Sequence, residues 1–599
     1  MQPSGDRESG NGPDGESALR PSGLQPSGGG GNGGGAWRKI VPIAVVLVVI
    51  AAVVVAVVAS GGDDDEGQAA DTTTVNAGAT DPADAVMLEP ALSYPRADAE
   101  GTADEIEWGD RCDTENGRIA LPLFPQQFCF APFEGGDNGG ETSPGVSADT
   151  IKVVVYLTQA DDPVLRFIYN QIGNDDTPDD SWATYLSYAE ILNHYYETYG
   201  RKVELIRYDA TGTISDSVAA TADAETIAND IRPFMVLNGP LLTNAFADTL
   251  AQNQVMCVSC TPGQPAQWYI DRAPYVWDIA KSQNENQIQV AEYIGKRLAG
   301  DPAKWAGDPA LTSKERVFGY VGVDTGDQSK QLREEFQADL QDNYDVEFAA
   351  IETYALPTDL AGSGRDVITR LKEAGVTSVV FQGDPLAPQT LTKVATEQGY
   401  FPEWIITGSV LVDTTAFSRS YDQEQWSHAF GPSNLFARVD PNTAGSRYLH
   451  DWYYGEQPPA DQSSAVILPN LQFIYNPLQA IGTDVTPENF EKVLFGAPIL
   501  PSTPVTPQIS YGNRGIWPFT DYSALDDQTE VWWDPTATGV DELDREGVGM
   551  WRYVDNGKRY LPGEWPDTAP NVFVEEGSVT IFPEAPPEAA IKDDYVPLK

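Results

Sequence analysis

Short apolar runs rich in β-branched residues alternate with longer amphipathic segments from about residue 150 onward. The first run, 151–158, is expected to form a strand, and 180–199 follows as a helix with apolar residues along one face. The same alternation continues through strands at 203–208, 234–237 and 255–258 and helices at 217–231 and 244–251. Strands that alternate with helices predict βαβ units, and hence a parallel sheet.

A second series of the same kind starts near residue 282. Its expected helices are 282–299, 330–342, 365–374 and 388–398, and its expected strands are 316–323, 346–354, 378–382 and 404–407. Two successive α/β sheets predict two lobes. A ligand would then bind between the lobes, at the C-terminal ends of the strands.

The regularity weakens after about residue 441. Helices are expected at 444–454, 468–481 and 487–494. Two aromatic-rich strands are expected at 530–534 and 549–560, and the pair Asn556-Gly557 predicts a hairpin turn in the second of them. The stretch 572–599 is rich in Pro and Glu and is expected to wrap the surface or to fray.

The most apolar part of the chain is the uninterrupted run from Ile40 to Ala59, which follows the basic pair Arg38-Lys39. Twenty residues at about 1.5 Å per residue span about 30 Å, the thickness of a bilayer's hydrocarbon core. Basic residues before the run predict a cytoplasmic N-terminus and an extracytoplasmic main domain. A cleaved signal peptide is the alternative, although the run is longer than usual for one. We expect a single-pass protein of the cell membrane.

These patterns divide the chain into eight parts. They are a disordered cytoplasmic tail (1–36), a transmembrane helix (37–60), a disordered acidic linker (61–105), a disulfide-containing N-terminal extension (106–149), a first lobe (150–280, completed by part of 400–500), a second lobe (281–400), lobe-crossing and helical segments (401–500) and an aromatic-rich C-terminal extension (501–599). The expected architecture is α/β, with two Rossmann-like lobes joined by a hinge.

Composition narrows the range of functions. The chain has 89 acidic and 37 basic residues and a formal net charge of -52, whereas a nucleic-acid-binding protein needs a basic footprint. No G-x-S-x-G, H-E-x-x-H or phosphate-loop motif occurs, and three scattered histidines offer little general-base capacity. We therefore expect no nucleic-acid partner, no catalysis and no cofactor.

Four cysteines, Cys112, Cys129, Cys257 and Cys260, lie on the predicted exported side, where disulfides persist. Four cysteines allow three pairings. We favour Cys112 with Cys129, because closing a loop of that size is worth about 3 kcal/mol. The remaining pair has C-x-x-C spacing, for which we favour a local structural disulfide over a redox centre. Zinc is not expected, because neither a second such pair nor a nearby histidine is present.

An ordered series of motifs resembles the type I periplasmic binding proteins of the branched-chain amino acid uptake family. The motifs are Pro144–Val153, Ala222–Ala228, Asn238-Gly239-Pro240, Gln254–Ser259 and Gly319–Asp324, the last of which begins the second lobe as it does in the family. The similarity covers roughly 145–480. The Cys112 region and the tryptophan-rich C-terminal part are similar to versions of this family found in actinobacteria.

The resemblance implies a two-lobed type I periplasmic-binding-protein fold that closes on a small polar solute and presents it to an ABC permease. The solute would be amino-acid-like, an amide or a carboxylate. The alternative is a membrane-anchored sensor or envelope-interaction protein with the same fold, since a shuttling receptor needs neither an anchor nor a cytoplasmic tail.

The resemblance also implies where the solute binds, because family ligands are held by hydroxyl and amide groups at strand ends. In the first lobe the matching loop residues, which would cradle a carboxylate, are Asn238, Gly239, Thr243, Asn244, Ser259, Thr261 and Gly263. Tyr156 and Thr158, at the end of the first strand, are further cleft candidates. Across the cleft they are Asp324, Asp327, Gln328, Gln382, Asp384 and Ser409. Helix capping is the alternative role for Thr243, Asn244 and the aspartates.

One departure from the family pattern concerns the solute itself. The run Gly408-Ser409-Val410 stands where amino-acid-binding members carry an acidic residue for the ligand amine. The resemblance therefore does not imply an α-amino acid, and amides, peptides, polyols or aromatic acids stay open as ligands.

Overall fold

The computed structural model describes residues 81–355, 360, 362–592 and 594–599. The predicted cytoplasmic tail, the predicted transmembrane helix at 37–60 and the linker up to residue 80 lie outside these residues. Within the described part of the chain, no helix is both long and apolar enough to cross a membrane.

The first sheet has five parallel strands in the order β4-β3-β5-β6-β7. Its strands are β3 (Thr150–Leu157), β4 (Lys202–Asp209), β5 (Met235–Leu237), β6 (Met256–Val258) and β7 (Val276–Trp277). The helices α3 (Pro178–Tyr195), α4 (Ser217–Thr226), α5 (Ala245–Gln252) and α6 (Ala266–Ile270) connect them. This strand order is one of the two common orders of doubly wound α/β sheets, as the alternating pattern predicts.

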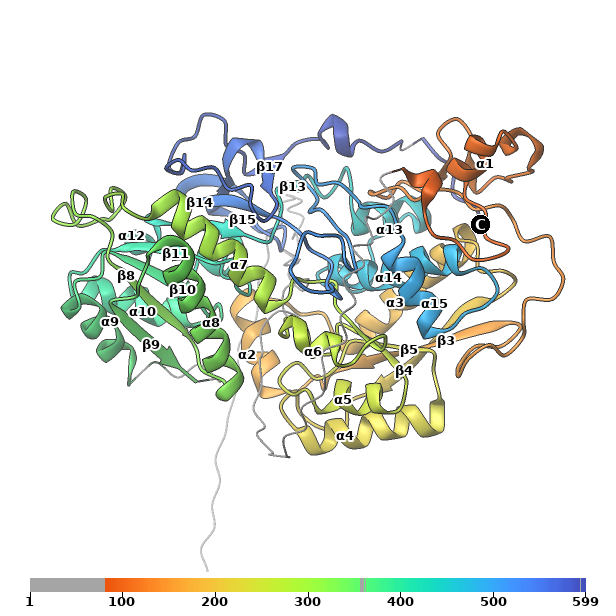
Figure 1. Ribbon diagram of the computed structural model, residues 1–599, viewed down its shortest axis with the longest axis horizontal. Helices are drawn as coiled ribbons and strands as arrows, with labels where there is room; N and C mark the ends of the chain where they lie inside the picture. The colour runs from red at the N-terminus through yellow and green to blue at the C-terminus, as the bar shows by residue number, and fades with distance from the viewer. Residues whose placement is uncertain (1–80, 356–359, 361, 593) are drawn as a thin grey trace, which may run out of the picture. The chain divides into compact units, whose positions relative to one another are not determined.

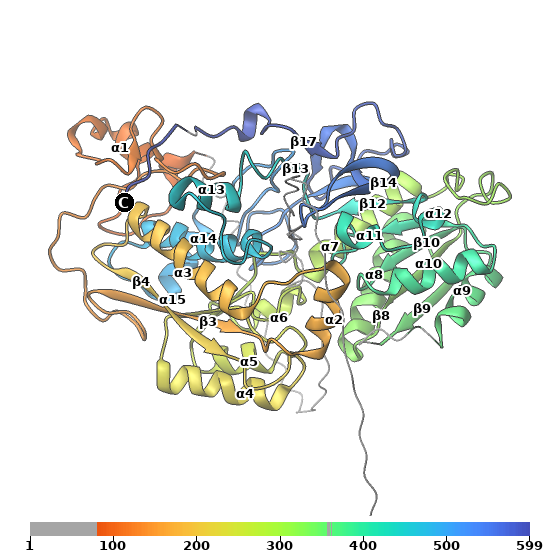
Figure 2. The ribbon, with the colours of Figure 1, turned by 180° about the vertical axis from the view of Figure 1, so that it is seen from behind.

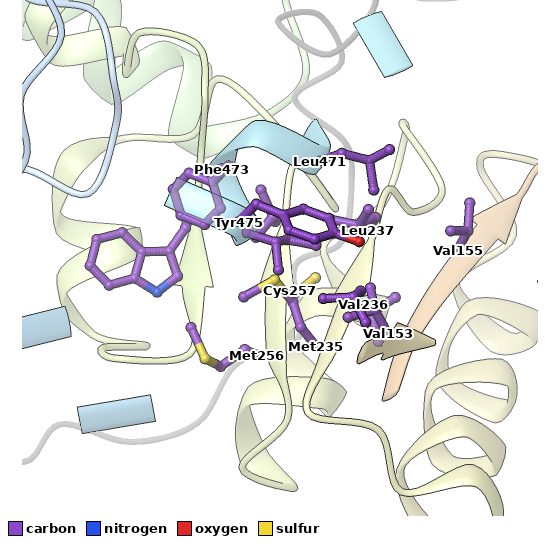
Figure 3. Close-up of a cluster of buried hydrophobic side chains, with 14 of the residues drawn as sticks. Val153, Val155, Met235, Val236, Leu237, Met256, Cys257, Leu471, Phe473 and Tyr475 are labelled. Atoms are coloured by element: carbon purple, nitrogen blue, oxygen red, sulfur yellow. The ribbon is translucent and has the colours of Figure 1, made fainter. Parts of the chain in front are cut away.

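Helices from much later in the sequence complete the core of the first sheet. Val153 and Met235 on β3 and β5 are fully buried and belong to the same hydrophobic cluster as Leu471 and Tyr475 of α14. Figure 3 shows these side chains gathered around the buried Cys257. The helices are α13 (Ser446–Tyr454), α14 (Ser464–Ile481) and α15 (Pro487–Phe495). They lie beside the first sheet in both ribbon views (Figures 1 and 2).

The second sheet has the order β15-β14-β12-β11-β10-β8-β9, with β16 beside β14. Its parallel strands are β8 (Phe318–Val323), β9 (Ala350–Tyr354), β10 (Ser378–Gln382), β11 (Glu403–Ile406) and β12 (Ala429–Ser433). They are flanked by α7 (Gln283–Tyr293), α8 (Asp327–Tyr344), α9 (Gly364–Glu373) and α10 (Ala387–Glu397). The chain runs from β8 to β9 on one side and then returns to β10 on the other, so the switch point of the sheet lies between β8 and β10.

The second sheet continues beyond residue 400, into the aromatic-rich C-terminal part. Strands β14 (Gln528–Val540), β15 (Glu546–Tyr553) and β16 (Arg559–Tyr560) extend it in antiparallel fashion from β12. Trp532 and Trp533 are adjacent on β14 and are buried in different hydrophobic clusters. Successive side chains of a strand point to opposite faces, so this pair helps to cover both faces of the sheet.

The predicted hairpin at Asn556-Gly557 is wrong. Both β15 and β16 pair with β14 and run antiparallel to it, Tyr553 opposite Val531 and Arg559 opposite Thr529. The chain therefore keeps its direction through the intervening turn. Asn556 and Gly557 do adopt the positive φ angles that the pair favours, 55° and 82°. These angles let the chain form a turn between β15 and β16 without reversing the direction of the chain.

The folded region also begins earlier than Trp108, so the predicted disordered linker is wrong for its last part. Helix α1 (Tyr94–Glu100) is capped by Ser93, and Ala97 packs with Trp108 and Cys129 in a small core. Leu88 N donates to the carbonyl of Ala480 at 2.8 Å. Backbone pairing and a small apolar core thus stabilise a stretch whose composition suggested a flexible tether.

Several smaller elements complete the described structure. They are α2 (Pro163–Ile172), α11 (Thr415–Ser418), α12 (Gln423–Trp426), the π-helical turns Ile227–Ile231 and Ile294–Leu298, and the short strand pairs β1 (Cys112–Asp113) with β2 (Arg118–Ile119) and β13 (Arg438–Val439) with β17 (Ile581–Phe582).

Both predicted disulfides are present, and the C-terminal stretch 572–599 packs along the surface, as one of the two expectations for it had it. Cys112 bonds to Cys129 and Cys257 bonds to Cys260. The indole of Trp452 donates to the carbonyl of Tyr595 at 2.9 Å, and Leu598 N donates to the hydroxyl of Tyr195 at the same distance.

Candidate functional site

A pocket of about 120 Å³ lies at the C-terminal ends of the second-sheet strands. Tyr320 and Val323 of β8 and Gln382 of β10 line it, which places it at the switch point of the sheet. The other lining residues come from Lys281 and the N-terminal part of α7, from α8, from the loops after β8, β10, β11 and β12, and from the first-sheet loop at Gly263. They include Ser282, Gln283, Asn286, Gln287, Thr325, Ser409 and Asn434.

The start of α7 is held rigidly against this pocket. Ser282 accepts from Glu285 N, and the Glu285 carboxyl accepts in return from Ser282 N at 2.8 Å, which forms a capping box. The amide of Gln283 donates to the carbonyl of Gln264 at 3.2 Å. The backbone donors of this helix end are therefore largely occupied by the protein itself.

Asn286 connects α7 to the loops after β11 and β12. Its Nδ2 donates to the carbonyl of Thr407 at 3.0 Å, and its Oδ1 accepts from Asn434 and Gln528, both at 2.9 Å. Asn434 also donates to the carbonyl of Gly408 at 3.1 Å. This amide network fixes two walls of the pocket relative to each other.

Three residues expected from the family resemblance lie in this pocket. Gly263 (φ 69°) donates its N–H to Asp278 at 2.8 Å. Gln382 Oε1 accepts from the Tyr320 hydroxyl at 3.4 Å, and Ser409 Oγ accepts from Gly383 N at 3.2 Å. Hence one residue from a first-sheet loop and two from the second sheet meet at one cavity.

The other expected first-sheet residues form a closed polar cluster. Asn238 Nδ2 donates to the Tyr185 hydroxyl at 2.9 Å, and its Oδ1 accepts from Asn470 at 3.0 Å. Ser259 Oγ donates to the same Asn470 at 3.3 Å. An added Cβ at Gly239 would lie 2.5 Å from the carbonyl oxygen of Cys260, so the protein's own backbone occupies the space the glycine provides.

Thr243, Thr261 and Asn244 likewise bond within the protein. The Thr261 hydroxyl donates to the carbonyl of Thr243 at 3.2 Å, and Thr243 Oγ1 accepts from Ala245 N at 3.3 Å. Asn244 Nδ2 donates to Gln264 at 3.2 Å. None of the three lines the pocket.

Tyr156 and Thr158 also lie outside the pocket. The Tyr156 side chain is buried, and its hydroxyl donates to Asp223 at 2.9 Å. Burial and the neighbouring Asp223 carboxylate raise the pKa of Tyr156 above its usual range. Tyr156 is thus part of a buried network under α4.

The expected aspartates on the second sheet occupy helix starts. Asp384 is buried and accepts from Leu386 N at 2.8 Å, at the start of α10. Asp324 is exposed and accepts from Gly326 N and the Ser329 hydroxyl. Asp327 and Gln328 are the first residues of α8. These four residues do not line the pocket, and capping fits the aspartates better.

Sequence reasoning missed Gln283, Asn286, Gln287 and Asn434. The helix 282–299 was expected, but its apolar stripe predicts only the buried face of the helix and not the polar residues that line the pocket. The spacing of Gln283 and Gln287, four residues apart, placed both on one helical face and could have indicated a polar wall. Asn434 follows a strand, β12, that no sequence pattern predicted.

Charged groups lie near the N-terminal end of α7, and the one that lines the pocket is bonded to other residues of the protein. The ammonium of Lys281, the one charged residue among the described residues that line the pocket, donates to Gln289 and to the carbonyl of Asp527, the latter at 3.0 Å. Burial lowers the pKa of Lys281 to about 8. Nearby, burial and the Glu285 carboxyl raise the pKa of Asp521 well above its usual range.

A second cavity, of about 650 Å³, lies between α13 and the β14–β15 hairpin. Its lining includes Asp440, Asp461, Asp544, Glu546 and Arg447. The Arg447 guanidinium is already paired with Asp461 and Asp544. This cavity is therefore dominated by acidic groups, unlike the pocket at the switch point.

Comparison with known proteins gives similarity only at the level of structure. No protein-family profile matches the sequence, and no curated protein sequence matches it either. Among solved structures, the chain is similar to a solute-binding protein of an ABC transporter from R. palustris in complex with 4-hydroxybenzoate. The TM-score is 0.46 and the identity 13%, over 67% of this chain and 97% of the other.

Two further solved structures show the same likeness. One is the branched-chain amino acid transporter substrate-binding protein from Streptococcus pneumoniae in complex with isoleucine, with a TM-score of 0.44 and 13% identity over 68% of this chain and 100% of the other. The other is a type I periplasmic binding protein from Bordetella pertussis, with a TM-score of 0.45 and 12% identity over 67% and 100%. These three solved structures are thus two ligand-binding proteins of transporters and one type I periplasmic binding protein.

Proposed function

We propose that this protein is an extracytoplasmic receptor that binds a small polar solute and delivers it to an ABC permease. The observation that carries the proposal is the pocket at the switch point of the second sheet. Open α/β sheets bind ligands at such points, and this one is lined by amide and hydroxyl groups together with a glycine from a loop of the first sheet.

The connections between the two sheets support closure around a solute. The chain passes from β7 into α7, from β12 into α13, and from α15 back into β14. The pocket adjoins two of these connections, through Ser282 at the start of α7 and through Asn434 just after β12. A change in the relative position of the sheets would therefore open or close the pocket directly.

The proposal extends to location and partners. We place the receptor at the cell membrane, with its N-terminus cytoplasmic and the predicted helix at 37–60 as an anchor. Two disulfides fit an oxidising compartment outside the cytoplasm. An anchored receptor stays near its permease, so the solute is handed over without diffusion of the protein.

The experiment is to purify the full-length chain and identify co-purified small molecules by mass spectrometry. A panel of amino acids, amides and carboxylates is then screened by thermal shift, because a ligand that binds only the folded state raises the melting temperature. We expect at least one solute to stabilise the protein. We expect Gln382→Ala to lower the affinity for that solute at least tenfold, and so to reduce its thermal shift. Gln252→Ala, on an exposed position at the end of α5, is the matched control.

Two results would count against the proposal. If no solute co-purifies and none in the panel raises the melting temperature, solute binding is wrong. If a solute binds but cells lacking the protein take it up at the normal rate, the receptor acts as a sensor and delivery to a permease is wrong.

A further inference from the structure

The pocket presents several neutral polar groups that have no partner in the described part of the protein. Gln287 lines the pocket and is only 7% exposed, and its carboxamide is not among the enclosed unpaired groups of the described residues, so it faces the open cavity. The Gln283 carboxamide, four residues earlier on the same helical face, is likewise unpaired within the described residues. The buried Thr325 hydroxyl also lacks a partner there.

Two more lining groups keep unused hydrogen-bonding capacity. Gln382 uses its Oε1 to accept from Tyr320, which leaves its NH₂ group without a described acceptor. Ser409 Oγ accepts from Gly383 N, and its own O–H is not donated to any described residue. Of these groups, the Thr325 hydroxyl is the one enclosed by the described residues, whereas the amides and the Ser409 hydroxyl are open to the cavity. A ligand that fills the cavity would displace water from these amides and hydroxyls, so it needs matching donors and acceptors.

Charged solutes find no compensation in the same pocket. No aspartate or glutamate is among its lining residues, so a ligand ammonium would have no counterion. The Lys281 ammonium is already bound by Gln289 and the Asp527 carbonyl. At the start of α7, the N–H groups of Ser282 and Gln283 are bonded to Glu285 and Gln264. A ligand carboxylate would lose its hydration and would meet no free cationic side chain among the described lining residues.

We infer that the solute is uncharged and carries hydroxyl or carboxamide groups that both donate and accept hydrogen bonds. Carboxamide and hydroxyl side chains are themselves both donors and acceptors, so they complement such groups in either direction. Val323, Leu332 and Val410 also line the pocket and offer apolar surface to the carbon skeleton of the solute. Polyols, monosaccharides and small neutral amides share this chemistry. The inference rests on the proposed function and narrows its ligand.

The test compares neutral probes with charged relatives of the same size on the full-length chain. One arm uses glucose, glucuronate and glucosamine, and the other uses propionamide, propionate and propylammonium. Affinities are measured by calorimetry, with thermal shift as a second readout. We expect the neutral member of at least one arm to bind at least tenfold more tightly than both charged members, and the arm that responds identifies hydroxyl or amide chemistry.

A charge-changing variant sharpens the test. Gln287→Glu keeps the size of the side chain and places a carboxylate on the pocket wall, so we expect weaker binding of the neutral probe and tighter binding of its cationic relative. Gln252→Glu makes the same change at an exposed position and is the control. Circular dichroism of the unliganded variants confirms that both are folded.

The outcomes separate this inference from the proposed function. If a carboxylate, an ammonium compound or a zwitterionic amino acid binds more tightly than every neutral probe, the neutral-solute inference is wrong and solute binding stands. If neither the neutral nor the charged probes bind, and no amino acid or carboxylate does, then solute binding itself is overturned, and the inference with it.

Discussion

The buried carboxylate of Asp223 provides a direct test of the role given to Tyr156. Asp223 is 1% exposed and accepts four hydrogen bonds. Its Oδ2 accepts from the Tyr156 hydroxyl at 2.9 Å and from Thr211 N at 3.0 Å, and its Oδ1 accepts from the Tyr208 hydroxyl at 3.0 Å and the Thr211 hydroxyl at 2.7 Å. We predict that Asp223→Asn destabilises the first sheet without weakening solute binding.

The magnitude follows from the loss of charge. The NH₂ group of the carboxamide can face the Tyr208 and Thr211 hydroxyls, which are able to accept. The four hydrogen bonds then change from charge-assisted bonds, about 1.5–3 kcal/mol each, to neutral bonds of about 0.5–1.5 kcal/mol each, so the free energy of unfolding should fall by about 4 kcal/mol. Tyr156→Phe removes one donor and leaves three bonds to the carboxylate. It should cost about 1.5–3 kcal/mol, the range for a hydrogen bond to a charged group.

The assay is urea unfolding of the full-length wild type and both variants, followed by circular dichroism and tryptophan fluorescence, with calorimetry for solute affinity. The predicted pattern is a lower urea midpoint, larger for Asp223→Asn than for Tyr156→Phe, and unchanged affinity. Wild-type urea midpoints combined with a large loss of affinity would instead assign Tyr156 to the ligand site.

Three further predictions concern stability. Burial raises the pKa of Asp413 to about 7, so its contribution to stability is complete below the unfolded-state pKa of about 3.9 and is lost as the pH rises towards 7. Between pH 4 and pH 8, the free energy of unfolding of Asp413→Asn should therefore rise by about 4 kcal/mol relative to that of wild type. The same difference in melting temperature between variant and wild type at both pH values would contradict this. Replacing Cys112 and Cys129 by serine opens a loop with a sequence separation of 17 and should cost about 3 kcal/mol, seen as faster proteolysis of the N-terminal extension. Gly431→Ala brings a Cβ within 2.3 Å of a β11 carbonyl oxygen and should lower stability by about 1–3 kcal/mol, whereas Gly362→Ala, with open space around it, should melt like wild type.

The regular part of the fold was accessible from the sequence because each βα unit repeats a strong local pattern. Strands such as β3 and β10 contain short apolar runs, Val153–Leu157 and Val379–Phe381, which is typical of strands buried on both faces. The pattern carried no information on distant pairing, however. Nothing local indicates that β14 joins β12, or that α14 covers β3 and β5, because these contacts join segments far apart in the chain.

The candidate site was predicted only in part, for a related reason. Gln382, Ser409 and Gly263 follow strands or their loops, where α/β proteins bind ligands. Asn238 and Thr261 fit the same rule, but their hydrogen bonds are completed by Tyr185, Asn470 and Thr243, whose proximity depends on the tertiary structure. Whether a polar side chain at a strand end serves a ligand or the protein depends on those partners, which the sequence does not display.

The most direct test of the account is an experimental structure of the full-length protein with its co-purified or screened solute. The account predicts ligand density in the pocket between α7 and the C-terminal ends of β8 and β10. Polar ligand atoms should lie about 3 Å from Gln287 and Ser409, the distance of an ordinary hydrogen bond. Density beside Asn238 and Gly239, or in the acidic cavity near Arg447, would contradict it.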